Sequence, residues 1–485
     1  MNARHFINGG WQPSSDGRMA ASFNPATGER LGDFADGGAA EAETAVAAAR
    51  SAFEETAWGQ SPRDRQMVLL RWADAMEARG EELARCLTLT NGKPLPQSRG
   101  EIAGAVSEIR YYAGLTRHFP GSAMEVAPGE FSTMIREPAG VAGLIIPWNA
   151  PAVLLIRSLA PALGAGCATV TKPAPQTALF SAKVFETLVD VPGLPDGVVN
   201  VFFETGHEGA MRLVASAEVD TISFTGSTKV GEAIMVAAAP TMKKLSLELG
   251  GKSCCVVLAD ADIAAVAPKL AAAATIIAGQ QCTGARRVLV HESRYGEMKT
   301  VLSAALAAIK VGNGLGAGID MGPLIDQRAR AGVKEEIESA LDACDEVLLR
   351  GGIPDGAPEA SAFLTPSLVA QRDENASFCQ EEVFGPLLVL EPFADEREAV
   401  KKANNTTFGL SASVWTNDGP ASMRLARALR NGTVWINDHN KLFAEAETGG
   451  YRRSGLGRLH GFDALHDFSE LKHIYQNVGT IRGGA

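Results

Sequence analysis

The chain has 485 residues, 46% of them hydrophobic, so it is long enough for a large core and for two or three cooperating domains. Its formal net charge is −11 without a long run of like charges, which argues against a nucleic-acid or anionic-membrane partner. The first twelve residues lack the apolar core of a secretory signal, and no stretch is apolar enough to span a membrane, so we expect a cytoplasmic protein. The seven cysteines show neither paired nor His/Cys spacings, which predicts reduced thiols and no metal site.

The first half of the chain is expected to form helices followed by βαβ units. The segments 41–53 and 62–91 are rich in Ala and Leu with acidic residues towards their starts, which predicts two helices. From residue 141 to 260, short β-branched runs alternate with runs of helical length, separated by Gly, Pro and Asn. Right-handed crossovers place such strands in one parallel sheet, and ligands bind at the carboxyl ends of its strands. The expected strands are 141–146, 167–172, 198–203 and 221–226, and the expected helices are 151–166 and about 177–189.

A second α/β region is expected between residues 250 and 450. Its alanine-rich segment 264–278 is punctuated by Leu and Ile, which favours a buried helix over a disordered tract. The other expected elements are strands over 254–259, 286–291, 387–393 and 432–437, and helices over 295–310 and 396–404.

Three residues are candidates for chemistry. Cys282 lies in the polar, Gly-flanked turn GQQCTG, so its thiol is a candidate nucleophile, although most free cysteines are inert core residues. Glu248, in LELGGKS, lies among leucines that predict partial burial and a pKa raised towards the range of a general base; the alternative is a solvated surface charge. Asn149, in PWNAP, could direct its amide at an oxyanion or cap the following helix.

Two further segments could hold a phosphate-bearing ligand. In FTGSTKVG, a strand runs into a helix, and Gly226, Ser227 and Gly231 would allow backbone N–H groups to approach a pyrophosphate, although a plain strand-to-helix turn has the same glycine spacing. Lys172, in VTKPAP at a strand end, would suit a ribose or phosphate; the alternative is an ordinary exposed lysine.

Taken together, the segments resemble those of one enzyme family. PWNAP, TKPAPQT, FTGSTKVG, LELGGKS, GQQCTG, EEVFGP and GGYRRSGLGR, in this order, resemble the aldehyde dehydrogenase superfamily across nearly the whole chain. The resemblance implies that Cys282 attacks an aldehyde, that Asn149 and the N–H of Cys282 hold the oxyanion, and that Glu248 activates water to release the acid. It also implies NAD or NADP as cofactor, with contacts from Ile146, Trp148, Lys172, Pro175, Gly226, Ser227, Glu382 and Phe384.

The resemblance further implies a three-part α/β architecture. A Rossmann-like nucleotide-binding domain would comprise residues 1–118 and 138–249, and an α/β catalytic domain would comprise 250–450. A small β element, 119–137 and 467–485, would join subunits into homodimers or homotetramers.

Four positions depart from the family pattern. Pro175 stands where many NAD-using relatives carry an acid, so its position offers no carboxylate to repel the 2′-phosphate of NADP. Leu459 stands where many relatives carry a glutamate proposed as a second proton relay. Ala150 stands where many relatives have a bulky aromatic residue, and Arg157 stands at a position often occupied by tryptophan. We therefore expect both residues to contact substrate and to admit an aromatic or carboxylated aldehyde. The alternative for Arg157 is a structural ion pair.

The sequence thus predicts NAD(P)-dependent oxidation of an aldehyde to a carboxylic acid through a thiohemiacetal and a thioester on Cys282. Two enzymatic alternatives stay open: a thiol acyltransferase or esterase without redox chemistry, and a CoA-acylating semialdehyde dehydrogenase. A non-catalytic binding role is a third, since a fold does not fix a function.

Overall fold

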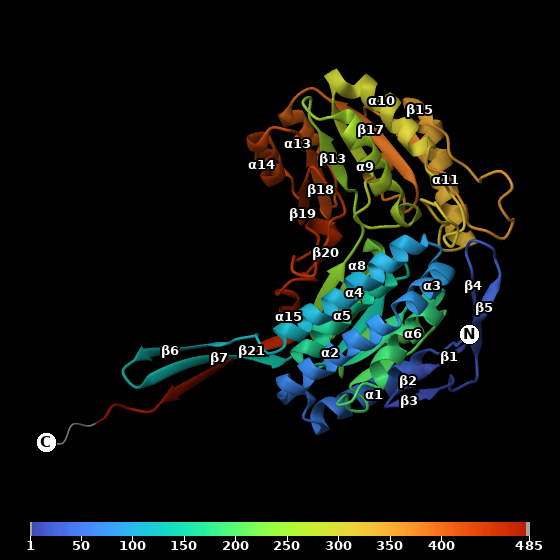
Figure 1. The fold of residues 1–485 in the computed structure, drawn as a ribbon. Coiled ribbons are helices and arrows are strands. Elements are labelled where there is room, and N and C mark those ends of the chain that lie inside the picture. The colour runs from blue at the N-terminus through green and yellow to red at the C-terminus, as the bar shows by residue number, and fades with distance from the viewer. Residues whose placement is uncertain (1, 482–485) are drawn as a thin grey trace.

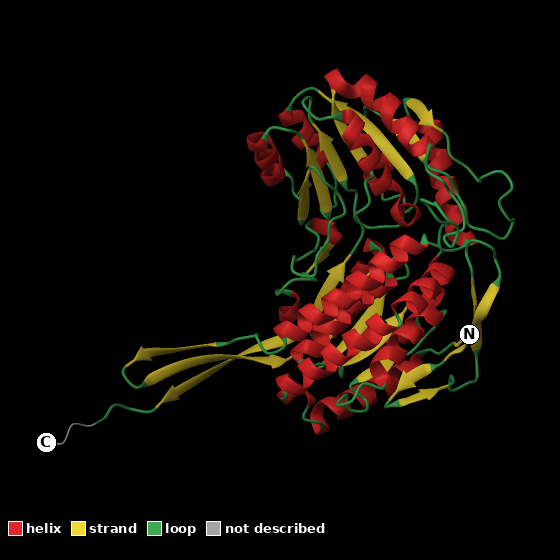
Figure 2. Ribbon diagram, viewed as in Figure 1, coloured by secondary structure: helices red, strands yellow, loops and turns green. Residues whose placement is uncertain are grey.

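A computed structural model describes residues 2–481 as two α/β lobes with a projecting β arm (Figure 1). In each lobe, helices flank a central sheet (Figure 2). None of the helices in the described part of the chain is both long and apolar enough to cross a membrane. The predicted α/β class with a Rossmann-like sheet is confirmed.

The first lobe is built on an eight-stranded sheet with five parallel central strands. From β8, the chain adds β9 and β10 on one side and then returns to add β11 and β12 on the other. The carboxyl ends of β8 and β11 therefore flank a topological switch point, where ligands bind in open α/β sheets. In spatial order the strands are β20 (Gly455–Leu456), β12 (Lys244–Glu248), β11 (Thr221–Thr225), β8 (Val141–Ile146), β9 (Ala168–Pro173), β10 (Val199–Val201), β2 (His5–Ile7) and β3 (Gly10–Gln12).

Helices cover both faces of this sheet because its central strands are apolar on both. Along β8, Ala142 and Leu144 pack into one core with α2 to α6, while Val141 and Ile145 pack into another with α1, α7 and α8, as the two-residue period of a strand requires. The helices are α1 (Ala39–Glu55), α2 (Pro62–Ala78), α3 (Gly80–Asn91), α4 (Leu95–Leu115), α5 (Pro151–Ala165), α6 (Ala178–Val189), α7 (Glu208–Ala215) and α8 (Thr228–Ala238).

The second lobe contains a seven-stranded sheet that is parallel except for β15. Its strands are, in spatial order, β15 (Glu346–Leu349), β16 (Ser367–Ala370), β17 (Leu387–Phe393), β14 (Arg287–His291), β13 (Cys254–Val257), β18 (Ser411–Trp415) and β19 (Thr433–Ile436). Its main helices are α9 (Ile263–Thr275), α10 (Glu292–Ala307), α11 (Gln327–Ala343), α13 (Glu396–Asn404) and α14 (Gly419–Ala428).

A three-stranded antiparallel sheet forms the arm. It consists of β6 (Ser122–Ala127), β7 (Glu130–Pro138) and β21 (Ser469–Asn477), and it exposes Met124 and Leu471 among other apolar side chains. A second small sheet, β1 (Asn2–Ala3), β5 (Arg30–Ala35) and β4 (Met19–Phe23), lies near the amino terminus. The residue boundaries given for the three domains stay a prediction.

Several expected elements differ from the structure. The segment 62–91 forms two helices, α2 and α3, separated at Arg79. The sequence reading also missed α4, α11, α14 and β18, which flank or complete the two sheets. The helix expected over 264–278 ends at Thr275, because the chain turns there towards Cys282.

Candidate active site

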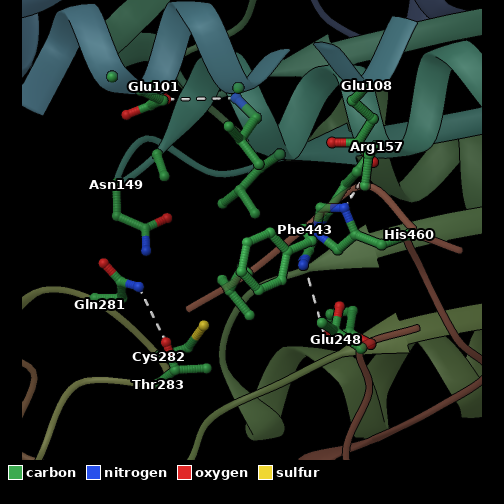
Figure 3. A pocket seen from close by; sticks show the side chains of 18 of the residues that line it. Glu101, Glu108, Asn149, Arg157, Glu248, Gln281, Cys282, Thr283, Phe443 and His460 are labelled. Carbon is green, nitrogen blue, oxygen red and sulfur yellow. Dashed lines mark hydrogen bonds and ion pairs between the residues drawn. The ribbon is translucent and has the colours of Figure 1, made fainter. Parts of the chain in front are cut away.

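The three candidate catalytic residues line one cavity. This cavity measures about 560 Å³ and has walls from α4, from α5, from the Cys282 loop and from the segment 442–449. Asn149, Glu248 and Cys282 all face it (Figure 3). The structure therefore brings together residues that lie 34 to 133 positions apart in the sequence.

A strained turn carries Cys282 to the cavity. After α9, Ile277 and Ala278 have φ angles of 50° and 54°, and Gly279 has a φ of 74°. Left-handed backbone is unfavourable for a β-branched residue such as Ile277, so surrounding packing must hold this turn in place. A Cβ on Gly279 would lie 2.3 Å from the carbonyl oxygen of Gly385, which requires glycine there.

The thiol of Cys282 is protonated at neutral pH. Burial raises its pKa to about 11, and the nearby charge of Arg157 opposes the increase. Unlike the buried Cys86 and Cys254, Cys282 is partly exposed. It is therefore accessible but needs a base before it can attack as a thiolate.

Glu248 can serve as that base. It ends β12 and is buried, so the alternative of a solvated surface charge is wrong. Burial raises its pKa to about 6, while Arg157 and then His460 oppose the increase. The carboxylate is consequently ionised at neutral pH yet close to the range in which it can accept a proton. The glycines that follow Glu248 let the backbone lie close to the Cys282 loop, since a Cβ on Gly251 would lie 3.0 Å from the carbonyl oxygen of Cys282.

Asn149 points its amide across the cavity towards the Cys282 loop. Its Nδ2 donates to the carbonyl of Gln280 at 3.0 Å, and the second amide hydrogen can serve an oxyanion. The helix cap of α5 is Ala150, so the capping alternative for Asn149 is wrong. Lys93 Nζ donates to the carbonyl of Asn149 at 2.8 Å and forms a buried ion pair with Glu101, which fixes this segment.

The predicted cofactor residues lie at the strand ends around the switch point and on the facing lobe. Ile146 ends β8, and the Trp148 and Phe384 rings meet edge to face with centroids 5.8 Å apart. The Oε1 atom of Glu382 is buried without a hydrogen-bond partner among the described residues. Three further residues lie at the ends of neighbouring strands. Lys172 is near the end of β9, with its Nζ 3.7 Å from Glu204, Gly226 follows β11, and Ser227 caps α8.

Two of these positions bear on the alternatives left open by the sequence. The side chain of Lys172 is only 12% exposed, so it is not an ordinary surface lysine, and burial lowers its pKa. Pro175 begins a 3-10 turn directly after β9 and brings no charge to it.

Of the predicted substrate residues, Ala150 and Arg157 both line the cavity. Arg157 Nη2 donates to Thr225 Oγ1 at 3.0 Å and lies 3.9 Å from Glu248 Oε2. The guanidinium therefore has an acidic neighbour, as the alternative of a structural ion pair requires. That neighbour, Glu248, is also the candidate base. Leu459 packs in the main core of the first lobe.

Sequence reasoning missed several residues of the cavity wall. Glu101 and Glu108, both on α4, face the cavity, as does His460. The two glutamates are seven residues apart and so share one face of the helix, a spacing that the sequence shows once the helix is recognised. His460 follows Leu459 directly, and its placement depends on a left-handed turn, with φ 58°, that the sequence does not reveal.

Comparisons with known proteins show the family of this chain. The model of the aldehyde dehydrogenase family matches residues 11–474. The chain is 38% identical to phenylacetaldehyde dehydrogenase of Pseudomonas fluorescens, covering 96% of this chain and 94% of that protein. It is 36% identical to betaine aldehyde dehydrogenase of Bacillus subtilis, covering 99% and 98%. The solved structure of betaine aldehyde dehydrogenase from Staphylococcus aureus in complex with NAD+ matches with a TM-score of 0.95 at 33% identity, covering 98% of this chain and 95% of that one. This chain belongs to the aldehyde dehydrogenase family.

Proposed function

We propose that this protein oxidises an aldehyde to a carboxylic acid with NAD or NADP, through a thiohemiacetal and a thioester on Cys282. The observation that carries the proposal is the shared cavity, in which a thiol, a carboxylate and an amide donor lie on facing walls. A nucleophile, a base and an oxyanion donor are the groups that such chemistry needs.

The reaction begins with transfer of the Cys282 proton to Glu248, whose pKa of about 6 leaves it ionised at neutral pH. The thiolate then bonds to the aldehyde carbon, and the developing oxyanion accepts hydrogen bonds from Asn149 Nδ2 and the N–H of Cys282. When bound, the nicotinamide supplies the hydride acceptor that turns the thiohemiacetal into a thioester. Glu248 then gives the Cys282 proton to cavity water and is ionised again. It next takes a proton from water as the water attacks the thioester; the C–S bond breaks, the acid leaves and the thiolate is restored.

The residues at the switch point fit a dinucleotide. The unpartnered Oε1 of Glu382 can accept a hydrogen bond from a ribose hydroxyl. Gly226 is required where β11 runs into α8, since a Cβ there would lie 2.4 Å from the Phe224 ring, and the start of α8 that follows can approach a phosphate. Trp148 and Phe384 offer apolar surface for the nicotinamide ring. An Escherichia coli relative, 37% identical, is described as NADP/NAD-dependent.

The cavity wall favours a bulky aldehyde, aromatic or carboxylated. Gly100, Gly104 and Ala150 leave space along one side, and Phe443 gives an aromatic surface on another. A cavity of about 560 Å³ lined in this way can hold a substituted ring. Arg157 lies in the same wall, where it can attract a carboxylate while it faces Glu248.

We further propose that the enzyme works as a cytoplasmic homodimer or homotetramer. The arm supports this proposal, because it holds apolar side chains such as Val126 and Ile474 away from both lobes, where a second subunit could cover them.

The test is an assay of aliphatic, aromatic and carboxylated aldehydes with each dinucleotide, followed by the appearance of reduced cofactor. Cys282→Ala should abolish turnover, while dinucleotide binding, measured by fluorescence or calorimetry, stays intact. Cofactor reduction by Cys282→Ala would refute the covalent mechanism. Acid release from an ester or thioester without cofactor reduction would support the acyltransferase alternative instead.

A further inference from the structure

A second acid–base pair lies in the wall of the cavity. His460 Nδ1 is 2.7 Å from Glu108 Oε1, and both side chains are 3% exposed. Glu108 comes from α4, and His460 from the turn after Leu459, so the pair joins two segments that are distant in the chain. Figure 3 shows the pair beside Arg157 and on the same side of the cavity as Glu248.

Polar atoms of this group lack partners. Glu108 Oε1, both ring nitrogens of His460 and Glu248 Oε1 are buried without a hydrogen-bond partner among the residues that the structure describes, so the 2.7 Å contact of Glu108 with His460 is close but not aligned as a hydrogen bond. A buried polar atom without a partner is costly, and a polar cavity can satisfy several such atoms with one bridging water. The neighbouring Leu459 offers no such group, because it packs into the hydrophobic core.

The charges around His460 suit proton exchange with Glu248. Glu108 faces the imidazole from α4, with 2.7 Å between Oε1 and Nδ1, and Arg157 from α5 lines the same cavity. Other titratable groups nearby include Tyr112, whose hydroxyl donates to the carbonyl of Gly461, Glu447, which accepts from the N–H of Phe462, and Glu445 in the cavity wall. Arg458 and Asp467 act with His460 on the charge of Glu248. Imidazole is the side chain that gains and loses protons near neutral pH.

We infer that the Glu108–His460 pair takes the proton from Glu248 after each turnover and delivers it to solvent. The inference rests on the proposed function. Glu248 holds the proton that it took from the attacking water; it passes this proton through a cavity water to His460 Nε2. His460, with Glu108 at its Nδ1, then passes the proton to cavity water that exchanges with solvent. Glu248 is thereby ionised again for the next turnover.

The left-handed backbone of His460 allows a clean test. Asn and Gly both tolerate its φ of 58°, so His460→Asn and His460→Gly keep the turn while removing the imidazole. His466→Asn is the matched control, since His466 lies outside the cavity lining. Each variant is measured in a single turnover and at steady state, with and without added imidazole.

Single-turnover cofactor reduction should stay near wild type in His460→Asn, because hydride transfer precedes any loss of a proton from Glu248. Steady-state kcat should fall about tenfold, less than for a group that moves a proton in the transition state itself. Added imidazole should restore kcat in His460→Gly, and Glu108→Gln should also lower kcat. The control His466→Asn should show none of these effects.

Three outcomes would overturn the inference: unchanged steady-state kcat in His460→Asn, an equal loss in both regimes, or no rescue of His460→Gly by imidazole. An equal loss would mark His460 as a purely structural residue. Failure of the proposed function is visible separately, because it would appear as cofactor reduction by Cys282→Ala whatever residue 460 does.

Discussion

Arg157 Nη2 lies 3.9 Å from Glu248 Oε2, and each side chain is only 5% exposed. The hydrogen bond from Arg157 to Thr225 holds the guanidinium in this place. Burial raises the pKa of Glu248, and Arg157 is the largest influence that limits the increase. The arginine therefore sets the pH at which the base becomes active, apart from any contact that it makes with substrate.

Replacing Arg157 should shift the pH dependence of activity. In Arg157→Met, the pKa of Glu248 should rise above about 6, because burial is then less opposed. Since Glu248 works as a carboxylate, activity is lost as pH falls through this pKa, and the acid limb of kcat/KM should move to higher pH by about one unit. A pH profile with a neutral aldehyde measures the shift, and an unmoved limb would contradict it.

The same variant tests the proposed contact with substrate. Its KM for carboxylated aldehydes should rise more than its KM for neutral aldehydes of similar size, because the guanidinium no longer attracts the carboxylate. Equal increases for both classes would leave Arg157 with only its effect on Glu248.

Glu248→Gln should stop hydrolysis and change the pH dependence of stability. Cofactor reduction should slow as well, because Cys282 loses its base, and the thioester that still forms should persist on Cys282 and be visible by mass spectrometry of the intact protein. In the wild type, the raised pKa of Glu248 contributes stability that is present at low pH and lost as pH rises through about 6. The variant has no group that titrates at this position. Between pH 4 and pH 8, its free energy of unfolding should therefore rise by about 2 kcal/mol relative to that of the wild type. Urea unfolding at both pH values measures this difference. An equal change in the free energy of unfolding of the two proteins would contradict the raised pKa of Glu248.

The three candidate catalytic residues each lie in a short motif at a strand end or turn, and the resemblance of the ordered motifs to one family singled them out; their roles stay a prediction. Cys282, Glu248 and Asn149 could be named from such motifs, and the alternation along 141–146 predicted the central strand. Glu108 and His460 could not, because their pairing depends on how α4 packs against a left-handed turn 352 residues further along the chain. Arg157 was recognised, but its proximity to Glu248 is a product of tertiary packing that no local pattern encodes.

Lys93 should prove important for catalysis although it does not contact the reacting atoms. Lys93→Met leaves Glu101 buried and unpaired and removes a donor from the carbonyl of Asn149. Breaking a buried ion pair costs about 3–5 kcal/mol, so the melting temperature should fall and kcat should drop with it. In the double variant Lys93→Met/Glu101→Gln, stability should largely recover while kcat stays low. Full recovery of kcat would show that Lys93 does not position Asn149.

Pro175→Glu should bias the enzyme against NADP. A carboxylate at this turn would repel a 2′-phosphate and could accept hydrogen bonds from ribose hydroxyls. KM for NADP should rise about tenfold or more, while KM for NAD stays level or falls. Pro175→Gln is the uncharged control and should change the NAD/NADP ratio little. Equal changes for both dinucleotides in Pro175→Glu would place residue 175 away from the adenosine ribose.

Ala150 should decide how bulky an aldehyde the cavity admits. It caps α5 with a partly exposed methyl group in the cavity wall, beside Asn149, so a phenyl ring in its place would project into the space available to substrate. Ala150→Phe should lower kcat/KM for substituted aromatic aldehydes by about tenfold to a hundredfold, because a filled pocket rejects larger groups. Short aliphatic aldehydes should react almost as in the wild type, which controls for damage to Asn149. If both classes lose activity equally, Ala150 matters for the position of Asn149 and not for the choice of substrate.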